Sequence, residues 1–149
     1  MINFPVAPHF NYYECTCTNH SEHLEENRLR GFNKLYTLAD TVLILGENIR
    51  SHFNKPVIVL SLYRYLELNR AVGSKDNSQH PKGEALDFYV RGVPLLDVFL
   101  WIWKESDIRW GQLILEPSWI HISQGYPLRE RDRCGEVGIW TPNGVKLVL

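Results

Sequence analysis

The spacing of apolar residues between positions 25 and 53 constrains the fold more than any other feature of the sequence. These residues recur at steps of three and four, which places them along one face of an α-helix. We therefore expect one long amphipathic helix that ends before Pro56, because a proline disfavours helical backbone in the residue preceding it. The apolar face consists of Phe32, Leu35, Leu38, Val42, Leu45, Ile49 and Phe53.

Shorter apolar segments after this helix predict a sheet. VIVLS (57–61) is β-branched and uniformly apolar, as is typical of a buried strand, whereas EALDFYV (84–90) alternates between two faces. QLILE (112–116) and WIHIS (119–123) predict two further strands, which Pro117 and Ser118 separate.

A second apolar helix is predicted between the strands, where Pro94 precedes LLDVFLWIWKE. The order of elements predicts an α+β fold over residues 1–149: a single domain with a mostly antiparallel sheet and the second helix packed on the first. We expect residues 1–23 to be irregular. The tail, residues 124–149, contains a hairpin signal at Asn143 and Gly144.

Composition excludes several classes of protein. The formal net charge is −1, so the chain has no basic field with which to hold nucleic acid. The longest apolar run is short and contains Asp97, so no membrane insertion is expected. Three cysteines, Cys15, Cys17 and Cys134, do not form an even disulfide set. We expect a monomer that is synthesised in the cytoplasm without a signal peptide.

Two histidines and an aspartate stand out as candidate metal ligands. His80 lies in a loop, Gly83 allows the chain to turn, and Asp87 follows on the next strand. His121 lies on a later strand, between two isoleucines that point to the opposite face. Two imidazoles and one carboxylate, with a fourth position left to water, form a ligand set found at catalytic zinc sites. Glu116 is the candidate base for that water.

The motifs around these residues resemble those of a known family. SQHPKGEALD is similar to the Ser-x-His-x-x-Gly-x-Ala-x-Asp signature of the zinc D-alanyl-D-alanine carboxypeptidases, a family that includes L-alanyl-D-glutamate endopeptidases of phages and shares a fold with the hedgehog signalling domain. LILEPSWIHIS resembles its second signature, Trp-x-His after an acidic residue. YRYLELNRAVGSKDNSQH resembles the stretch before the first motif. The likeness extends over about residues 10–123.

This resemblance implies one zinc ion per chain, bound by His80, Asp87 and His121. It implies that Arg64 binds a substrate carboxylate or the developing oxyanion, because a guanidinium forms two parallel bonds with two oxygens. Ser78 is expected to form a hydrogen bond near the site and to contribute to substrate binding. Trp119 either supports His121 or belongs to the core, and we favour the core.

Two departures from the family pattern affect this assignment. Much of the family has its catalytic acid three residues before the last histidine, where this chain has Ser118. Glu116 stands at a five-residue offset from His121, which on one uninterrupted strand would put the two side chains on opposite faces. We therefore expect a bulge or bend at Pro117 and Ser118 that redirects Glu116. SLYRY also departs from the pattern, since Leu62 and Tyr65 replace smaller residues.

A second candidate zinc cluster is formed by Cys15, Cys17, His20 and His23. Their spacing is tighter than in zinc fingers, where a long segment separates the two ligand pairs. The resemblance accounts for this segment more simply, because an acidic-aromatic stretch with Ser, Thr or Cys commonly precedes the domain. We therefore prefer the explanation given by the resemblance over a second zinc cluster.

Two classes of function follow from these observations. The first is a zinc metallopeptidase that cleaves the stem peptide of bacterial peptidoglycan, as a carboxypeptidase or an endopeptidase. It would be a phage or prophage lysis enzyme that acts on the cell wall after release, or within the virion. The alternative is a non-catalytic, zinc-containing module that binds the cell wall or serves in a virion. The position of Glu116 relative to the metal ligands distinguishes the two.

Overall fold

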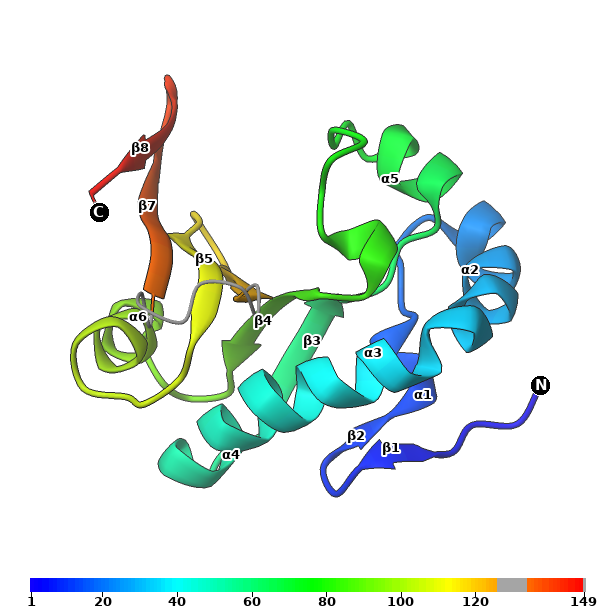
Figure 1. The fold of residues 1–149 in the computed structure, drawn as a ribbon, viewed down its shortest axis with the longest axis horizontal. Coiled ribbons are helices and arrows are strands. Elements are labelled where there is room, and N and C mark those ends of the chain that lie inside the picture. Colours follow the sequence, from blue (N-terminus) through cyan, green and yellow to red (C-terminus); the bar gives the residue numbers. More distant parts are fainter. Residues whose placement is uncertain (126–133, 149) are drawn as a thin grey trace.

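The computed structural model describes residues 1–125 and 134–148 (Figure 1). The α-helices are α1 Tyr12–Cys15, α2 Leu24–Gly31, α3 Leu35–Thr41, α4 Glu47–Phe53, α5 Leu66–Ala71 and α6 Leu95–Lys104. Four shorter or wider helical turns are η1 Ser21–His23, η2 Phe32–Lys34, η3 Val42–Gly46 and η4 His80–Lys82. The strands are β1 Pro5–Ala7, β2 Phe10–Asn11, β3 Val57–Ser61, β4 Ala85–Val90, β5 Trp110–Leu115, β6 Ile120–Gln124, β7 Cys134–Thr141 and β8 Gly144–Leu147.

The predicted long helix is present but is not uniform. Helical backbone runs from α2 to α4, with a 3-10 turn at Phe32–Lys34 and a π turn at Val42–Gly46. The first break follows Gly31 and the second ends at Gly46, and glycine is a poor helix former. A Cβ at Gly46 would lie 2.6 Å from the Phe10 ring, so this glycine allows the N-terminal segment to pack on the helix. The residues buried on the apolar face are Leu38, Val42, Leu45 and Ile49.

Six strands form one sheet in the order β3-β4-β6-β5-β7-β8. All neighbouring pairs are antiparallel except β5 and β7, so the sheet is mixed, with the antiparallel majority that the sequence predicts. The second helix, α6, packs on the first, because Trp101 stacks on His52 of α4 with ring centroids 3.9 Å apart. The α+β prediction is confirmed.

The N-terminal segment differs from the expected irregular chain. It forms a two-stranded sheet from β1 and β2, followed by the short helix α1 and the turn η1. Asn11 caps α1 by accepting a hydrogen bond from the backbone N–H of Glu14, whose carboxylate in turn accepts from the Asn11 N–H. Local side-chain capping of this kind orders a short segment that has no long apolar period.

The two faces of β4 have different surroundings. Leu86, Phe88 and Val90 are buried in the hydrophobic core together with the apolar face of the long helix. Asp87 and Tyr89 alternate with them and are only partly buried. The site described below therefore lies on the face of the sheet away from this core.

At the C-terminus, β7 and β8 form an antiparallel hairpin in which Thr141 pairs with Gly144. Gly144 has a φ of 107°, a conformation that glycine adopts without strain. Within the expected tail, residues 126–133 and 149 lie outside the described residues, as does the side chain of Cys134. No helix among the described residues is long and apolar enough to cross a membrane.

Candidate metal centre

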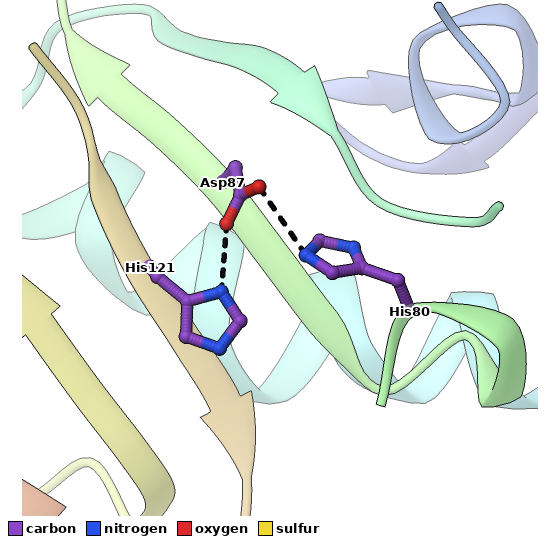
Figure 2. Close-up of side chains that lie close together, drawn as sticks. All are labelled: His80, Asp87 and His121. Atoms are coloured by element: carbon purple, nitrogen blue, oxygen red, sulfur yellow. Dashed lines mark hydrogen bonds and ion pairs between the residues drawn. The ribbon is translucent and has the colours of Figure 1, made fainter. Parts of the chain in front are cut away.

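Three predicted site residues from separate elements meet on the exposed face of the sheet. Figure 2 shows the Asp87 carboxylate between the rings of His80 and His121. Asp87 Oδ1 lies 2.7 Å from His121 Nδ1, and Asp87 Oδ2 lies 3.2 Å from His80 Nε2. Asp87 and His121 are paired directly across β4 and β6, which places both side chains on the same face.

His80 reaches this position because the chain turns sharply after it. Gly83 ends the turn η4 with a φ of 76°, in the left-handed region that glycine tolerates. Its N–H donates to the His80 carbonyl at 3.0 Å. The His80 side chain is 2% exposed, and its Nδ1 lies 2.7 Å from the carbonyl oxygen of Leu62. Because a carbonyl only accepts hydrogen bonds, Nδ1 carries the proton and Nε2 presents a lone pair.

This arrangement fits a bound zinc ion. The lone pair of His80 Nε2 faces a carboxylate oxygen, so a cation between the two atoms would be favourable. The candidate ligand atoms of His80, Asp87 and His121 all lie within 4.8 Å of one another. Two ligands of a tetrahedral zinc at about 2.1 Å are roughly 3.4 Å apart, close to the His80–Asp87 separation. The Leu62 carbonyl matches the outer hydrogen bond that commonly orients metal-bound histidines.

The electrostatics of Asp87 and His80 favour the protonation states that a metal requires. Burial alone raises the pKa of Asp87, but the neighbouring His80 and His121 outweigh it and hold this pKa well below its usual range. Burial lowers the pKa of His80, which outweighs the attraction of Asp87 for a proton there. An ionised carboxylate beside a neutral imidazole is the form in which both groups bind metal.

Glu116 lies on the same side of the sheet as His121, and the chain bends at Pro117 and Ser118 as expected. Strand β5 ends at Leu115, and the Glu116 N–H donates to the Trp119 carbonyl at 3.0 Å, which closes a tight turn. Ile114 pairs with His121 across the hairpin, and Glu116 is two residues beyond Ile114. Since residues two apart in a strand share a face, the bend at Pro117 and Ser118, which reverses the chain, puts Glu116 beside His121.

The local environment changes the proton affinity of Glu116. Burial raises the pKa of its carboxyl, and the negative charge of Asp87 adds to this effect while His121 opposes it. A carboxyl whose pKa is raised toward the working pH is a stronger base than an ordinary surface glutamate.

Arg64 lines the cavity around the candidate ligands, which is described below, and has a hydrogen-bond donor without a partner among the described residues. Its Nε is buried and has no hydrogen-bond partner among the described residues. Burial lowers the pKa of the guanidinium, and the Asp87 carboxylate opposes that shift. A buried donor without a partner is unfavourable unless a ligand satisfies it, so the geometry is suited to an anionic group of a substrate.

A cavity of about 690 Å³ surrounds the three candidate ligands, Arg64 and Glu116. Ser78 lines it, but its hydroxyl also accepts from the His80 N–H at 3.2 Å, which fixes the start of η4. Trp119 lines the cavity and is half-buried, so its expected place in the core is wrong. It lies at the end of the β5–β6 turn.

Further cavity residues were not predicted from the sequence. Lys75 comes from the loop after α5, Gln112 from β5 and Glu136 from β7. Gln112 Nε2 donates to Glu136 Oε2 at 2.8 Å, which joins the two strands at the edge of the cavity. In Figure 1 the loop after α5 and the β7–β8 hairpin lie on either side of β4. No local pattern marks these residues, because each belongs to a different segment.

The second candidate zinc cluster is not assembled. Within residues 1–125 and 134–148, the ligand atoms close enough to share a metal are those of His80, Asp87 and His121. Cys15 is buried in the core, and burial raises the pKa of its thiol to about 12. Cys17 Sγ lies 3.4 Å from the Leu60 carbonyl, and His23 Nδ1 is hydrogen-bonded to the Tyr65 hydroxyl.

The α+β fold and a His-Asp-His group beside a glutamate and an arginine define the class of metal-dependent hydrolases. Within this class, a family model described as Peptidase M15 matches residues 8–123. The chain therefore belongs to the M15 family of zinc peptidases, as the motifs predicted, and is a zinc metallopeptidase that acts on peptidoglycan. A comparison with curated proteins found no match.

Proposed function

We propose that the chain hydrolyses a peptide bond in the stem peptide of bacterial peptidoglycan with one zinc ion held by His80, Asp87 and His121. The observation that carries this proposal is the pairing of His80 Nε2 with Asp87 at 3.2 Å while Nδ1 faces the Leu62 carbonyl. A cation between these two atoms would be bound favourably, and the family is zinc-dependent.

Each residue of the cavity has a distinct role in this proposal. Zinc supplies Lewis acidity toward the scissile carbonyl and toward water. Glu116 accepts a proton from the attacking water and delivers it to the leaving amine. Arg64 binds the substrate's carboxylate or the developing oxyanion through its fork of N–H groups. Ser78 orders the turn that carries His80. Through this turn it also orders the part of the cavity wall that would contact the substrate.

The position of Glu116 favours catalysis over the alternative of a zinc-containing binding module. Glu116 lines the same cavity as the three candidate ligands, and both Asp87 and His121 influence its pKa. A module that only binds the cell wall has no need of a carboxylate with raised proton affinity at this place.

Two scissile bonds remain as proposals: the bond before a terminal D-alanine, and the bond between L-alanine and D-glutamate. A role as a phage or prophage lysis enzyme is likewise a proposal, based on the family resemblance. The size of the cavity, about 690 Å³, accommodates a short peptide in either case.

Defined muropeptides provide the test. Purified protein is incubated with pentapeptide and tetrapeptide stems, with zinc or with a chelator, and the products are identified by mass. We expect zinc-dependent cleavage at one bond and one equivalent of bound zinc. A His80→Ala, His121→Ala double variant should lose both. If this variant keeps a full equivalent of zinc, the proposed ligand set is wrong.

A further inference from the structure

Residues 62–65 form a backbone segment that touches the candidate site twice. The Leu62 carbonyl faces His80 Nδ1, and Arg64 carries the unpaired guanidinium Nε. The Arg64 N–H also donates to the His80 carbonyl at 3.3 Å. A shift of this segment would therefore move both the orienting partner of a candidate zinc ligand and the candidate substrate-binding group.

Asn27 of α2 holds this segment from the other side. Its Nδ2 donates to the Tyr63 carbonyl at 2.9 Å, and its Oδ1 accepts from the Tyr65 N–H at 2.9 Å. These two bonds lie on the residues immediately before and after Arg64. The second hydrogen of Nδ2 is directed to the Thr16 carbonyl, at 3.0 Å.

The chemistry of this position requires an amide. Asn27 is fully buried, with an exposed fraction of 0%, so each of its polar atoms needs a partner. Two carbonyl acceptors and one N–H donor surround it, which matches one NH₂ group and one oxygen and fixes the orientation of the amide. An apolar side chain would leave three buried backbone groups unpaired, and an aspartate would place a charge against two carbonyl oxygens.

We propose that Asn27 is a positioning residue for the active site: it fixes the backbone on both sides of Arg64 and, through the same segment, the Leu62 carbonyl that orients His80. This inference rests on the proposed function for its catalytic consequence. Its structural consequence, the order of residues 62–65, can be measured without turnover.

The first experiment measures that order in the zinc-free protein. Amide hydrogen exchange is followed at Arg64, because its N–H donates a hydrogen bond to the His80 carbonyl and not to Asn27. In Asn27→Ala we expect exchange at Arg64 to become at least about tenfold faster, while the amides that join β4 and β6 keep their protection. Val98→Ala is the matched control, since Val98 is also fully buried but lies on α6. Unchanged exchange at Arg64 in Asn27→Ala overturns the proposal.

The second experiment tests whether Asn27 acts through Arg64. We expect Asn27→Ala to lower kcat/KM on the stem peptide by roughly tenfold or more, and Val98→Ala to leave it nearly unchanged well below the melting temperature. In the Arg64→Lys background, Asn27→Ala should reduce kcat/KM by a smaller factor than in the wild type, because the part of its effect that passes through the guanidinium is already lost and only the part that passes through the Leu62 carbonyl remains. Losses that multiply in the double variant contradict a role through Arg64. If the wild type cleaves no stem peptide, the proposed function fails, while the exchange experiment still decides the positioning role.

Discussion

At His80 the two ring nitrogens have different neighbours and therefore different roles. Nδ1 is bound to the Leu62 carbonyl, and Nε2 is directed at Asp87. Surroundings also matter at Glu116 and Arg64. Burial raises the pKa of the Glu116 carboxyl, and the Nε of Arg64 is buried without a hydrogen-bond partner among the described residues. The reactivity of each residue is thus set by what surrounds a few atoms.

Glu116→Gln should keep zinc binding and lose most activity. The amide preserves the shape of the side chain but cannot accept the proton, and general-base catalysis typically contributes about a hundred- to ten-thousand-fold. Steady-state kinetics and metal content are measured together. Glu105→Gln is the control, because Glu105 is exposed at the end of α6 and does not line the cavity. Near-wild-type turnover in Glu116→Gln would exclude it as the base.

The raised pKa of Glu116 should appear in the pH profile of the enzyme. A base works only when deprotonated, so kcat/KM falls as the pH drops through this pKa. Because burial and Asp87 raise the pKa, the acid limb should begin at a higher pH than an ordinary glutamate would give. Rates are measured across the acidic range with zinc held constant. An acid limb that persists unchanged in the residual activity of Glu116→Gln assigns it to another group.

Arg64→Lys distinguishes the two roles open to Arg64. If the guanidinium binds a free C-terminal carboxylate, the variant loses about 1.5–3 kcal/mol of transition-state binding, and amidation of the substrate weakens the wild type similarly. Amidation should then affect the variant little further. If Arg64 faces the oxyanion, the variant is slow on both substrates and amidation hardly affects the wild type. We favour the carboxylate role. It would be excluded if the losses of activity caused by Arg64→Lys and by amidation of the substrate were independent and additive.

At the scale of the elements, two tight turns assemble the site. The turn between β5 and β6 brings Glu116 onto the face of His121, and the turn η4 places His80 over Asp87. Both turns end in bonds of the backbone itself, Glu116 to Trp119 and Gly83 to His80. The strands supply the alternation of faces, and the turns set which residues share one.

Gly83→Ala should weaken both the fold and the metal site. A left-handed backbone conformation is unfavourable for alanine by about 1–2 kcal/mol, and the new Cβ would lie 3.0 Å from Leu38 Cδ2. Urea unfolding and zinc affinity are the measurements. Gly92→Ala is a matched control, since Gly92 has the same φ of 76° with nothing within 4 Å of its Cβ position.

We expect Gly92→Ala to lose stability through backbone strain alone and to bind zinc as the wild type does. Gly83→Ala should lose more stability, because the new Cβ meets Leu38. It should also bind zinc more weakly, because a shift of the turn away from Leu38 weakens the hydrogen bond from the residue-83 N–H to the His80 carbonyl. Equal zinc affinity in the two variants would show that the turn does not position His80.

At the scale of the whole molecule, segments from the middle and from the C-terminal part of the chain build the cavity. The family match ends at residue 123, yet Gly135, Glu136 and Val145 of the C-terminal hairpin line the cavity together with Arg64 and Lys75. Residues of α3, η3, α4 and α6 form the core together with the apolar face of β4. The cavity therefore includes residues of β7 and β8, which lie beyond the family match.

Zinc should stabilise the folded protein as a whole, because its candidate ligands come from η4, β4 and β6. A ligand at 100 times its Kd adds about 2.7 kcal/mol to the free energy of unfolding. For a chain of 149 residues this corresponds to a rise in Tm of roughly 5–10 °C. Calorimetry with zinc and with chelator measures the shift. The His80→Ala, His121→Ala double variant should show none, and a shift retained there would locate the metal elsewhere.

Local periodicity was sufficient to predict most of the helices and strands after residue 23, because the three- and four-residue steps of the long helix and the alternation around Asp87 follow from backbone repeats of 3.6 and 2 residues. The candidate ligands His80 and His121 were found from their residue types and from the motifs around them. The breaks in the helix at Gly31 and Gly46 were not predicted, because they coincide with close packing against the distant N-terminal segment. The partial exposure of Trp119 and the proposed role of Asn27 were missed for a similar reason. Each depends on chain reversal or on contacts between segments far apart in the sequence, and such contacts are set by packing in three dimensions.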